Sequence, residues 1–156
     1  MAQRLVVKIG TKVITKIDGT IDSARISGIV EYFREFLKAG NELIVVTSGA
    51  VGLGRRELAM PKTLSLSQKQ ACAAVGQGLL MNYYHELFSS FSRKVAQILV
   101  TADDFVERQK YLNLRETLEM LLKLGVVPII NENDSISRAE LVEKTKGKSF
   151  GDNDRL

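Results

Sequence analysis

Four short apolar runs recur along the chain and predict the strands of a sheet. They cover residues 5–10, 43–46, 95–100 and 126–130. Each is rich in aliphatic residues and lacks the alternation with polar residues that marks a strand with one exposed face. Strands that are apolar throughout are typical of parallel sheets with both faces covered. We therefore predict four buried strands, the first of them at the amino terminus.

Between these strands, apolar residues recur every three or four positions, which predicts helices with one apolar face. Asp22 or Ser23 would cap the first helix and Ser67 the longest one. Gly76 and Gly78 lie inside that longest helix, where each costs about 1 kcal/mol relative to alanine, so they indicate close packing or a bend. The predicted helices cover residues 24–39, 50–58, 68–91 and 112–124, and a short turn or helix begins at Thr101.

The alternation of strands with helices predicts an α/β fold, with a mostly parallel sheet and helices on both faces. In such sheets, ligands bind beyond the carboxyl ends of the strands. The residues that directly follow the strands are therefore the candidates for chemistry. These segments are 10–12, 47–49, 101–104 and 131–134.

Composition excludes several classes of protein. The net charge of +4 comes from interspersed charges, so we expect no nucleic-acid partner, although small anionic substrates would fit. No apolar run is long enough to span a bilayer, and the amino terminus lacks the design of a signal peptide, so we expect no membrane association. The single cysteine, Cys72, excludes an internal disulfide and favours a buried thiol in a reducing, cytosolic setting.

Lys8 is the first candidate, because it interrupts an apolar strand two residues before a glycine. A charged side chain is costly there unless it has a partner. Either it carries its ammonium to water at the strand end, or it reaches toward a phosphate. In the second case Gly10 would let a backbone N–H group approach the same anion. The residues alone leave both interpretations open.

Ser48 and Gly49 are the second candidate, because a strand passes into a helix there. Free backbone N–H groups and the helix dipole make such a junction a site for anions. Thr47 and Ser48 are also good helix caps, so a plain cap explains the pattern equally well.

Two further polar clusters follow a strand or a glycine. Asn-Glu-Asn-Asp at 131–134 lies at the mouth of the fourth strand, where it would hold an ammonium or simply form a turn. Gly-Asp-Asn-Asp at 151–154 would bind an amine or a metal, orient a lysine, or cap a following helix. His85, the sole histidine, has no ligand spacing with its neighbours, so we predict no metal site and a surface or boundary position for it. The glycine at 147 lacks the strand and the second glycine of a P-loop.

Together these motifs resemble glutamate 5-kinases, a branch of the amino-acid kinase family, and the resemblance extends along the whole chain. The pair of motifs at 130–134 and 151–154 is rather specific to this branch. The Lys-x-Gly opening is shared with acetylglutamate, aspartate and carbamate kinases. Other matching segments are 6–10, 46–50, 74–78, 97–99, 111–113 and 127–131.

The resemblance implies a three-layer α/β/α fold, in which residues 1–156 form the amino-terminal, glutamate-binding part of a kinase domain. It also implies that ATP, with Mg²⁺, phosphorylates the side-chain carboxylate of L-glutamate to glutamyl 5-phosphate, the first step of proline synthesis. Such transfer depends on positioning and charge neutralisation rather than covalent work by the protein. Feedback inhibition by proline and a homo-oligomer are further implications.

The same resemblance assigns roles to residues. Lys8 would stabilise the transferring phosphoryl group, with the N–H groups of Gly10 and Gly49 on its oxygens. Asp154 would orient lysines around the phosphate, so Lys8 and Asp154 are expected to converge on one anion pocket. Glutamate would be held by Ser48, Asp134, Asp152 and Asn153.

The chain also departs from the family pattern. Lys12 replaces the usual small hydroxyl residue, which is either harmless or alters nucleotide binding, and the segment 135–150 is longer than usual. The family's nucleotide pocket and RNA-binding-like accessory domain would lie beyond residue 156, so we predict no phosphoryl transfer by residues 1–156 alone. Two alternatives stay open: a non-catalytic module that senses glutamate or proline, and a related kinase acting on acetylglutamate or aspartate.

Overall fold

The computed structural model describes residues 2–16 and 20–137 of the chain. Its strands form one sheet with the order β1-β2-β4-β3, and neighbouring strands pair in parallel. This confirms the predicted α/β class. The strands are β1 (Arg4–Ile9), β2 (Glu42–Thr47), β3 (Lys94–Val100) and β4 (Val126–Glu132).

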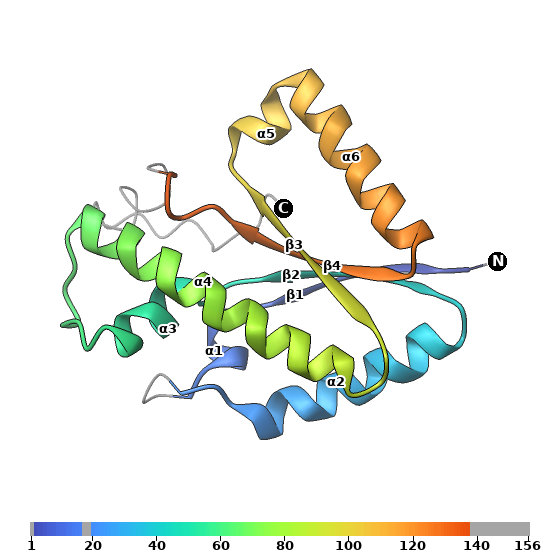
Figure 1. Ribbon diagram of the computed structural model, residues 1–156, viewed down its shortest axis with the longest axis horizontal. Helices are drawn as coiled ribbons and strands as arrows, with labels where there is room; N and C mark the ends of the chain where they lie inside the picture. The colour runs from blue at the N-terminus through green and yellow to red at the C-terminus, as the bar shows by residue number, and fades with distance from the viewer. Residues whose placement is uncertain (1, 17–19, 138–156) are drawn as a thin grey trace.

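Helices cover both faces of the sheet, as predicted. In Figure 1, α2 and α4 lie on one face and α5 and α6 lie on the other, which gives three layers. The helices in the described part of the chain are α1 (Thr11–Ile14), α2 (Ser23–Lys38), α3 (Ala50–Glu57), α4 (Leu66–Ser89), α5 (Asp103–Val106) and α6 (Arg108–Lys123).

Side-chain caps set where the two longer helices of the first half begin. Asp22 caps α2 as predicted, because its carboxylate accepts the N–H of Arg25 at 3.2 Å. In α4 the prediction of Ser67 as the cap was wrong. Ser65 caps this helix through a reciprocal capping box with Gln68. The helix therefore begins two residues earlier than the apolar pattern indicated.

β1 and β3 stand at the two edges of the sheet that the described residues form, so the prediction that all four strands are buried was wrong for both; in β3 only Val100 is buried. Leu5 is 40% exposed and Val6 is 56% exposed, whereas Ile9 at the far end of the strand is 2% exposed. β1 stands at one end of the strand order that the described residues form. Central and edge strands of a parallel sheet can share an apolar composition, so the pattern alone could not separate them.

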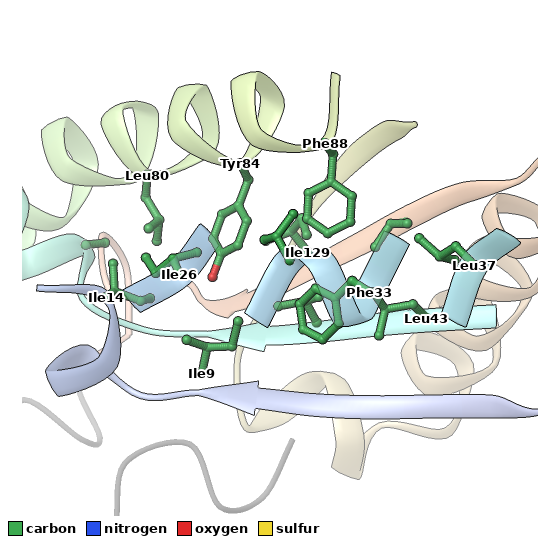
Figure 2. Close-up of a cluster of buried hydrophobic side chains, with 14 of the residues drawn as sticks. Ile9, Ile14, Ile26, Phe33, Leu37, Leu43, Leu80, Tyr84, Phe88 and Ile129 are labelled. Atoms are coloured by element: carbon green, nitrogen blue, oxygen red, sulfur yellow. The ribbon is translucent and has the colours of Figure 1, made fainter. Parts of the chain in front are cut away.

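The main core lies between the sheet and the pair of helices α2 and α4. Figure 2 shows Tyr84 and Phe88 of α4 pointing toward the sheet and α2, close to Phe33 and Ile129. The ring of Phe88 stacks on that of Phe33, with 6.3 Å between centroids. The aromatic residues of α4 are thus packing residues, as predicted. A smaller cluster under α6 covers the other face and comprises Ile44, Val46, Val100, Leu122 and Ile130.

Two glycines bring α3 and α4 into backbone contact. A Cβ atom on Gly76 would lie 1.8 Å from the carbonyl oxygen of Ala50, and one on Gly54 would lie 1.8 Å from that of Cys72. No side chain fits at such a distance, so both positions require glycine. Close packing is therefore the reason for Gly76, whereas the Cβ position of Gly78 has nothing within 4 Å.

Candidate functional site

The candidate residues lie at the carboxyl ends of three adjacent strands. Lys8 pairs with Val46, and Val46 pairs with Ile130, so β1, β2 and β4 end side by side. This is the edge at which parallel sheets bind ligands. Directly beyond it come Gly10 after β1, Ser48 and Gly49 after β2, and Asn133 and Asp134 after β4.

A hollow of about 340 Å³ opens at this edge, on the face of the sheet that α4 covers. That volume is within the range of small-molecule sites. Asp134 lines the hollow, and so does Ala50, the first residue of α3. Further walls come from Ala73, Ala74, Gln77 and Gly78 of α4 and from Gln97 and Leu99 of β3.

Ser48 does not cap α3, so the interpretation as a plain helix cap was wrong. The N-cap is Gly49, in a left-handed conformation with φ +104° that favours glycine, and no side-chain hydrogen bond caps the helix. The Ser48 hydroxyl lies 3.0 Å from the Thr11 hydroxyl, and the Thr47 hydroxyl lies 2.8 Å from that of Tyr84. Neither hydroxyl therefore accepts a hydrogen bond from the N–H groups at the start of α3. Those N–H groups stay available to a ligand.

Tyr84 is a buried residue of α4 that contacts the junction of β2 and α3 through the Thr47 hydroxyl. Burial raises the pKa of its hydroxyl well above the ordinary value, and the hydrogen bond with Thr47 opposes that shift only in part. The hydroxyl thus stays protonated at neutral pH. The end of β2 rests on a neutral, hydrogen-bonded group inside the core.

Gly10 is a glycine that the described protein atoms do not require. It precedes α1 with φ −73°, which any residue adopts, and nothing lies within 4 Å of the place where its Cβ atom would be. Glycine at such a place fits the close approach of a ligand to the backbone. The contact of the Gly10 N–H group with an anion stays a prediction.

Lys8 leaves the sheet from the face opposite the hollow. Side chains alternate along a strand, and Val7 and Ile9 pack into the core under α2 and α4, so Lys8 lies on the side of α6. Its side chain is exposed rather than enclosed in an apolar strand. The position leaves both interpretations of Lys8 open, and to contact a ligand in the hollow its ammonium would have to reach around the edge of the sheet.

The residues after β4 form a turn, as one interpretation of the 131–134 cluster predicted. The N–H groups of Ile136 and Ser137 donate to the Asn133 carbonyl, and the Ser135 hydroxyl donates to the Asn133 side-chain oxygen at 2.6 Å. The turn holds Asp134 against the hollow.

Asp152, Asn153 and Asp154 lie outside the described residues, and so does most of the segment 135–150. The convergence of Lys8 with Asp154 therefore stays a prediction. The structure does place His85 at the surface of α4 and Cys72 in the interior, as predicted. Within residues 2–16 and 20–137, no group of three or more His, Cys, Asp or Glu side chains could hold a metal ion, and no helix is long and apolar enough to cross a bilayer.

An amide cluster beside the hollow was not predicted from the sequence. Asn131 donates from its amide nitrogen to the side-chain oxygen of Gln77 at 2.9 Å, and Gln77 donates to that of Gln97 at 3.4 Å. Asn131 is 1% exposed and Gln77 is 8% exposed. Two signals in the sequence could have revealed this cluster. Gln77 lies among alanines and glycines in the longest helix, and Gln97 lies within an apolar strand.

The fold is that of a known class of proteins: the chain belongs to the amino acid kinase family, whose sequence model matches residues 3–156. Curated relatives include proteins named glutamate 5-kinase. The one from Geobacter sp. (strain M21) is 46% identical over 99% of this chain, and that from Acaryochloris marina is 46% identical over 100% of it. A third, from Moorella thermoacetica, is 45% identical over 99% of the chain. The chain spans 40%, 41% and 39% of the lengths of these relatives.

Solved structures of other kinases share the fold. A carbamate kinase from Giardia superposes with a TM-score of 0.55 at 13% identity, covering 84% of this chain and 60% of that one. UMP kinase from Bacillus anthracis gives 0.51 at 15% identity, covering 82% of this chain and 52% of that one. At these identities the likeness shows the fold alone, and it confirms the predicted amino-acid kinase architecture.

Proposed function

We propose that the full-length protein transfers the terminal phosphoryl group of ATP to the side-chain carboxylate of L-glutamate. Residues 1–156 would supply the glutamate side of that reaction. The proposal is carried by the agreement at 45–46% identity, along nearly the whole chain, with relatives that bear the name glutamate 5-kinase. The hollow at the strand ends supplies a place for the acceptor.

Glutamate would occupy this hollow with its amino group near Asp134, whose carboxylate suits an ammonium. Ser48 would contact the reacting end of the substrate, because it stands at the end of β2 next to α3. The Thr11 hydroxyl at 3.0 Å limits the orientations of the Ser48 hydroxyl. Asp152 and Asn153 would complete the glutamate site, and both lie outside the described residues.

The phosphoryl group would meet the acceptor at Gly10 and Gly49. A carboxylate oxygen of glutamate attacks the terminal phosphorus, the bond to the bridging oxygen breaks, and ADP leaves with the electron pair. The N–H groups at Gly49 and at the start of α3 would bind the charged oxygens. Lys8 would reach the same oxygens around the edge of the sheet, and Asp154 would orient it.

Mg²⁺ would arrive with ATP and neutralise charge on the phosphates. Magnesium sites of this kind are built from phosphate oxygens and one or two carboxylates, so they need no cage of protein ligands. Proline as a feedback inhibitor, a homo-oligomeric assembly and a cytoplasmic location complete the proposal, and the buried lone Cys72 fits the last of these.

The direct test is an assay of the full-length gene product for ATP-dependent glutamyl phosphate, with acetylglutamate and aspartate as competing substrates. We expect transfer to glutamate alone and no transfer by residues 1–156. Preference for another acceptor would overturn the proposed substrate. Calorimetry separates the sensor alternative, because a sensor binds glutamate or proline with an affinity that nucleotide leaves unchanged.

Ser48→Ala in the full-length protein tests the site itself. Loss of one hydrogen bond to a charged substrate should raise the KM for glutamate by about tenfold and leave the KM for ATP unchanged. Ser27→Ala is the matched control, since the Ser27 hydroxyl donates to the Ser23 carbonyl on the exposed side of α2. Equal effects of the two substitutions would remove Ser48 from the site.

A further inference from the structure

Three carboxamide side chains beside the hollow form a chain across three elements. Asn131 comes from β4, Gln77 from α4 and Gln97 from β3. The amide nitrogen of Asn131 donates to the oxygen of Gln77, and the nitrogen of Gln77 donates to the oxygen of Gln97. Gln77 and Gln97 both line the hollow.

This chain of amides has a direction. The Gln97 oxygen accepts from the Gln77 nitrogen at 3.4 Å with one of its two lone pairs, and the Gln97 amide nitrogen is left to donate to a ligand. Asn131 and Gln77 are buried, and burying amides is costly unless their hydrogen bonds are made. Apolar residues would fill the same space without that cost, so the amides point to recognition rather than to packing.

The position of Gln97 suits one end of an amino acid. β3 lies two strands away from β2 in the order β1-β2-β4-β3, which is about 10 Å at the usual spacing of strands. A substrate whose reacting carboxylate lies at Ser48 therefore extends its other end toward β4 and β3. There Asp134 offers a carboxylate and Gln97 offers N–H donors to the same hollow. The ammonium and the carboxylate that an amino acid carries on its α-carbon match the Asp134 carboxylate and the Gln97 donors.

We propose that Gln97 determines specificity by donating to the α-carboxylate of the substrate, and that Gln77 is a positioning residue that holds the Gln97 amide in this orientation. The inference rests on the proposed function, since it takes an amino acid as the occupant of the hollow. It adds a means of selecting α-amino acids over amines that lack the α-carboxylate.

The test uses Gln97→Glu in the full-length protein, because this change keeps the shape and replaces the donor with an anionic acceptor. We expect the KM for glutamate to rise by at least about tenfold, with the KM for ATP unchanged. Binding of 4-aminobutyrate, which lacks the α-carboxylate, should not weaken, since no contact is removed and the new carboxylate attracts its ammonium. Gln97→Met, which cannot repel a carboxylate, should show a smaller rise for glutamate.

Gln109→Glu is the matched control, because Gln109 donates to the Asn113 side chain at 3.0 Å on exposed α6, away from the hollow. Gln77→Met should raise the KM for glutamate less than Gln97→Glu does. The double substitution should then be no worse than Gln97→Glu alone, since Gln77 acts through Gln97. Additive effects would overturn the positioning role.

Two results would overturn the assignment of Gln97. One is a glutamate KM of the Gln97→Glu protein that matches the Gln109→Glu control. The other is equal weakening of glutamate and 4-aminobutyrate, which would indicate general damage to the hollow. Calorimetry measures the dissociation constants of the same proteins. A parent protein that binds glutamate but transfers no phosphoryl group overturns only the proposed activity. In that case the dissociation constants still decide the role of Gln97. A parent protein that binds no α-amino acid overturns both.

Discussion

The two faces of the sheet differ in how much hydrophobic core covers them. The face under α2 and α4 carries a large core with three stacked or tilted aromatic rings, Phe33, Tyr84 and Phe88. The face under α6 carries a small aliphatic cluster, and it leaves Val6 and Lys8 of β1 exposed. The hollow lies on the first face and Lys8 on the second.

This difference in packing separates a rigid face, which lines the hollow, from an open face, on which Lys8 is exposed. The well-packed face fixes the walls of the hollow, because α4 provides both the core residues and the lining. On the open face the Lys8 side chain is exposed, and under the proposed function it would meet the phosphate donor there. The acceptor and the donor would thus meet at the strand ends from opposite sides of the sheet.

The largest effect should come from Phe88→Ala, which empties the centre of the better-packed face. We expect a loss of about 3–5 kcal/mol in the free energy of unfolding of the full-length protein, measured by urea denaturation. Leu122→Ala on the α6 face is the comparison, and its cost should lie near the lower end, about 2 kcal/mol, because Leu122 has few buried partners. Equal losses would mean that the two faces contribute alike.

Gly76→Ala should come next, because the new Cβ atom meets the backbone of α3 at a distance that no rearrangement of side chains relieves. A loss of about 2–3 kcal/mol is expected from this overpacking. Gly78→Ala is the control two residues away and should be neutral or stabilising by up to about 1 kcal/mol, since alanine favours helix. If Gly78→Ala proved the worse of the two, the helix contact would be wrong.

Tyr84→Phe should cost about 1 kcal/mol, the net value of one buried hydrogen bond. A pH dependence follows from the raised pKa of Tyr84. Above the ordinary tyrosine pKa, the unfolded chain loses the phenolic proton while the folded protein keeps it, so stability is full below pH 10 or so and falls as pH rises beyond it. Denaturation curves between pH 8 and about 11 should show this fall, and Tyr84→Phe should weaken it.

Arg4→Gln should have the smallest effect. The carboxylates of Glu119 and Glu42 accept hydrogen bonds from Arg4 and raise its pKa, and these contacts join β1 to β2 and to α6. All three side chains are about a third exposed or more, so water and salt screen the pairs. The melting temperature should fall slightly at low salt and match that of the parent at 1 M salt, the condition that screens exposed pairs almost fully. A loss that persisted at high salt would show that packing of the Arg4 stem matters instead.

Local patterns were sufficient to predict the four strands and the longer helices, because apolar spacing and caps are properties of neighbouring residues, whereas the short helix α1 was not predicted. Asp22 and the strand at 43–46 are examples. The patterns could not predict the order of the strands or the exposure of Val6, because these depend on which distant strand lies alongside. For the same reason, the backbone contact at Gly76 appeared only as an unexplained glycine.

For the site, the predicted residues Lys8, Ser48 and Asp134 do lie at one edge of the sheet. The rule that parallel strands end together was enough to find that edge. It was not enough to give the face of Lys8 or the partner of the Ser48 hydroxyl, which depend on strand parity and on the left-handed Gly49. The amides at Gln77 and Gln97 come together only in three dimensions.

The contact between α3 and α4 also decides how the site can move. At Gly54 and Gly76 the two backbones approach so closely that no side chain fits between them, and we expect such tightly packed helices to move together as one wall. Among the described residues, any opening and closing around a substrate would then come from the side of the hollow opposite these helices. We expect it at the turn after β4, which carries Asp134 and is closed by hydrogen bonds to Asn133.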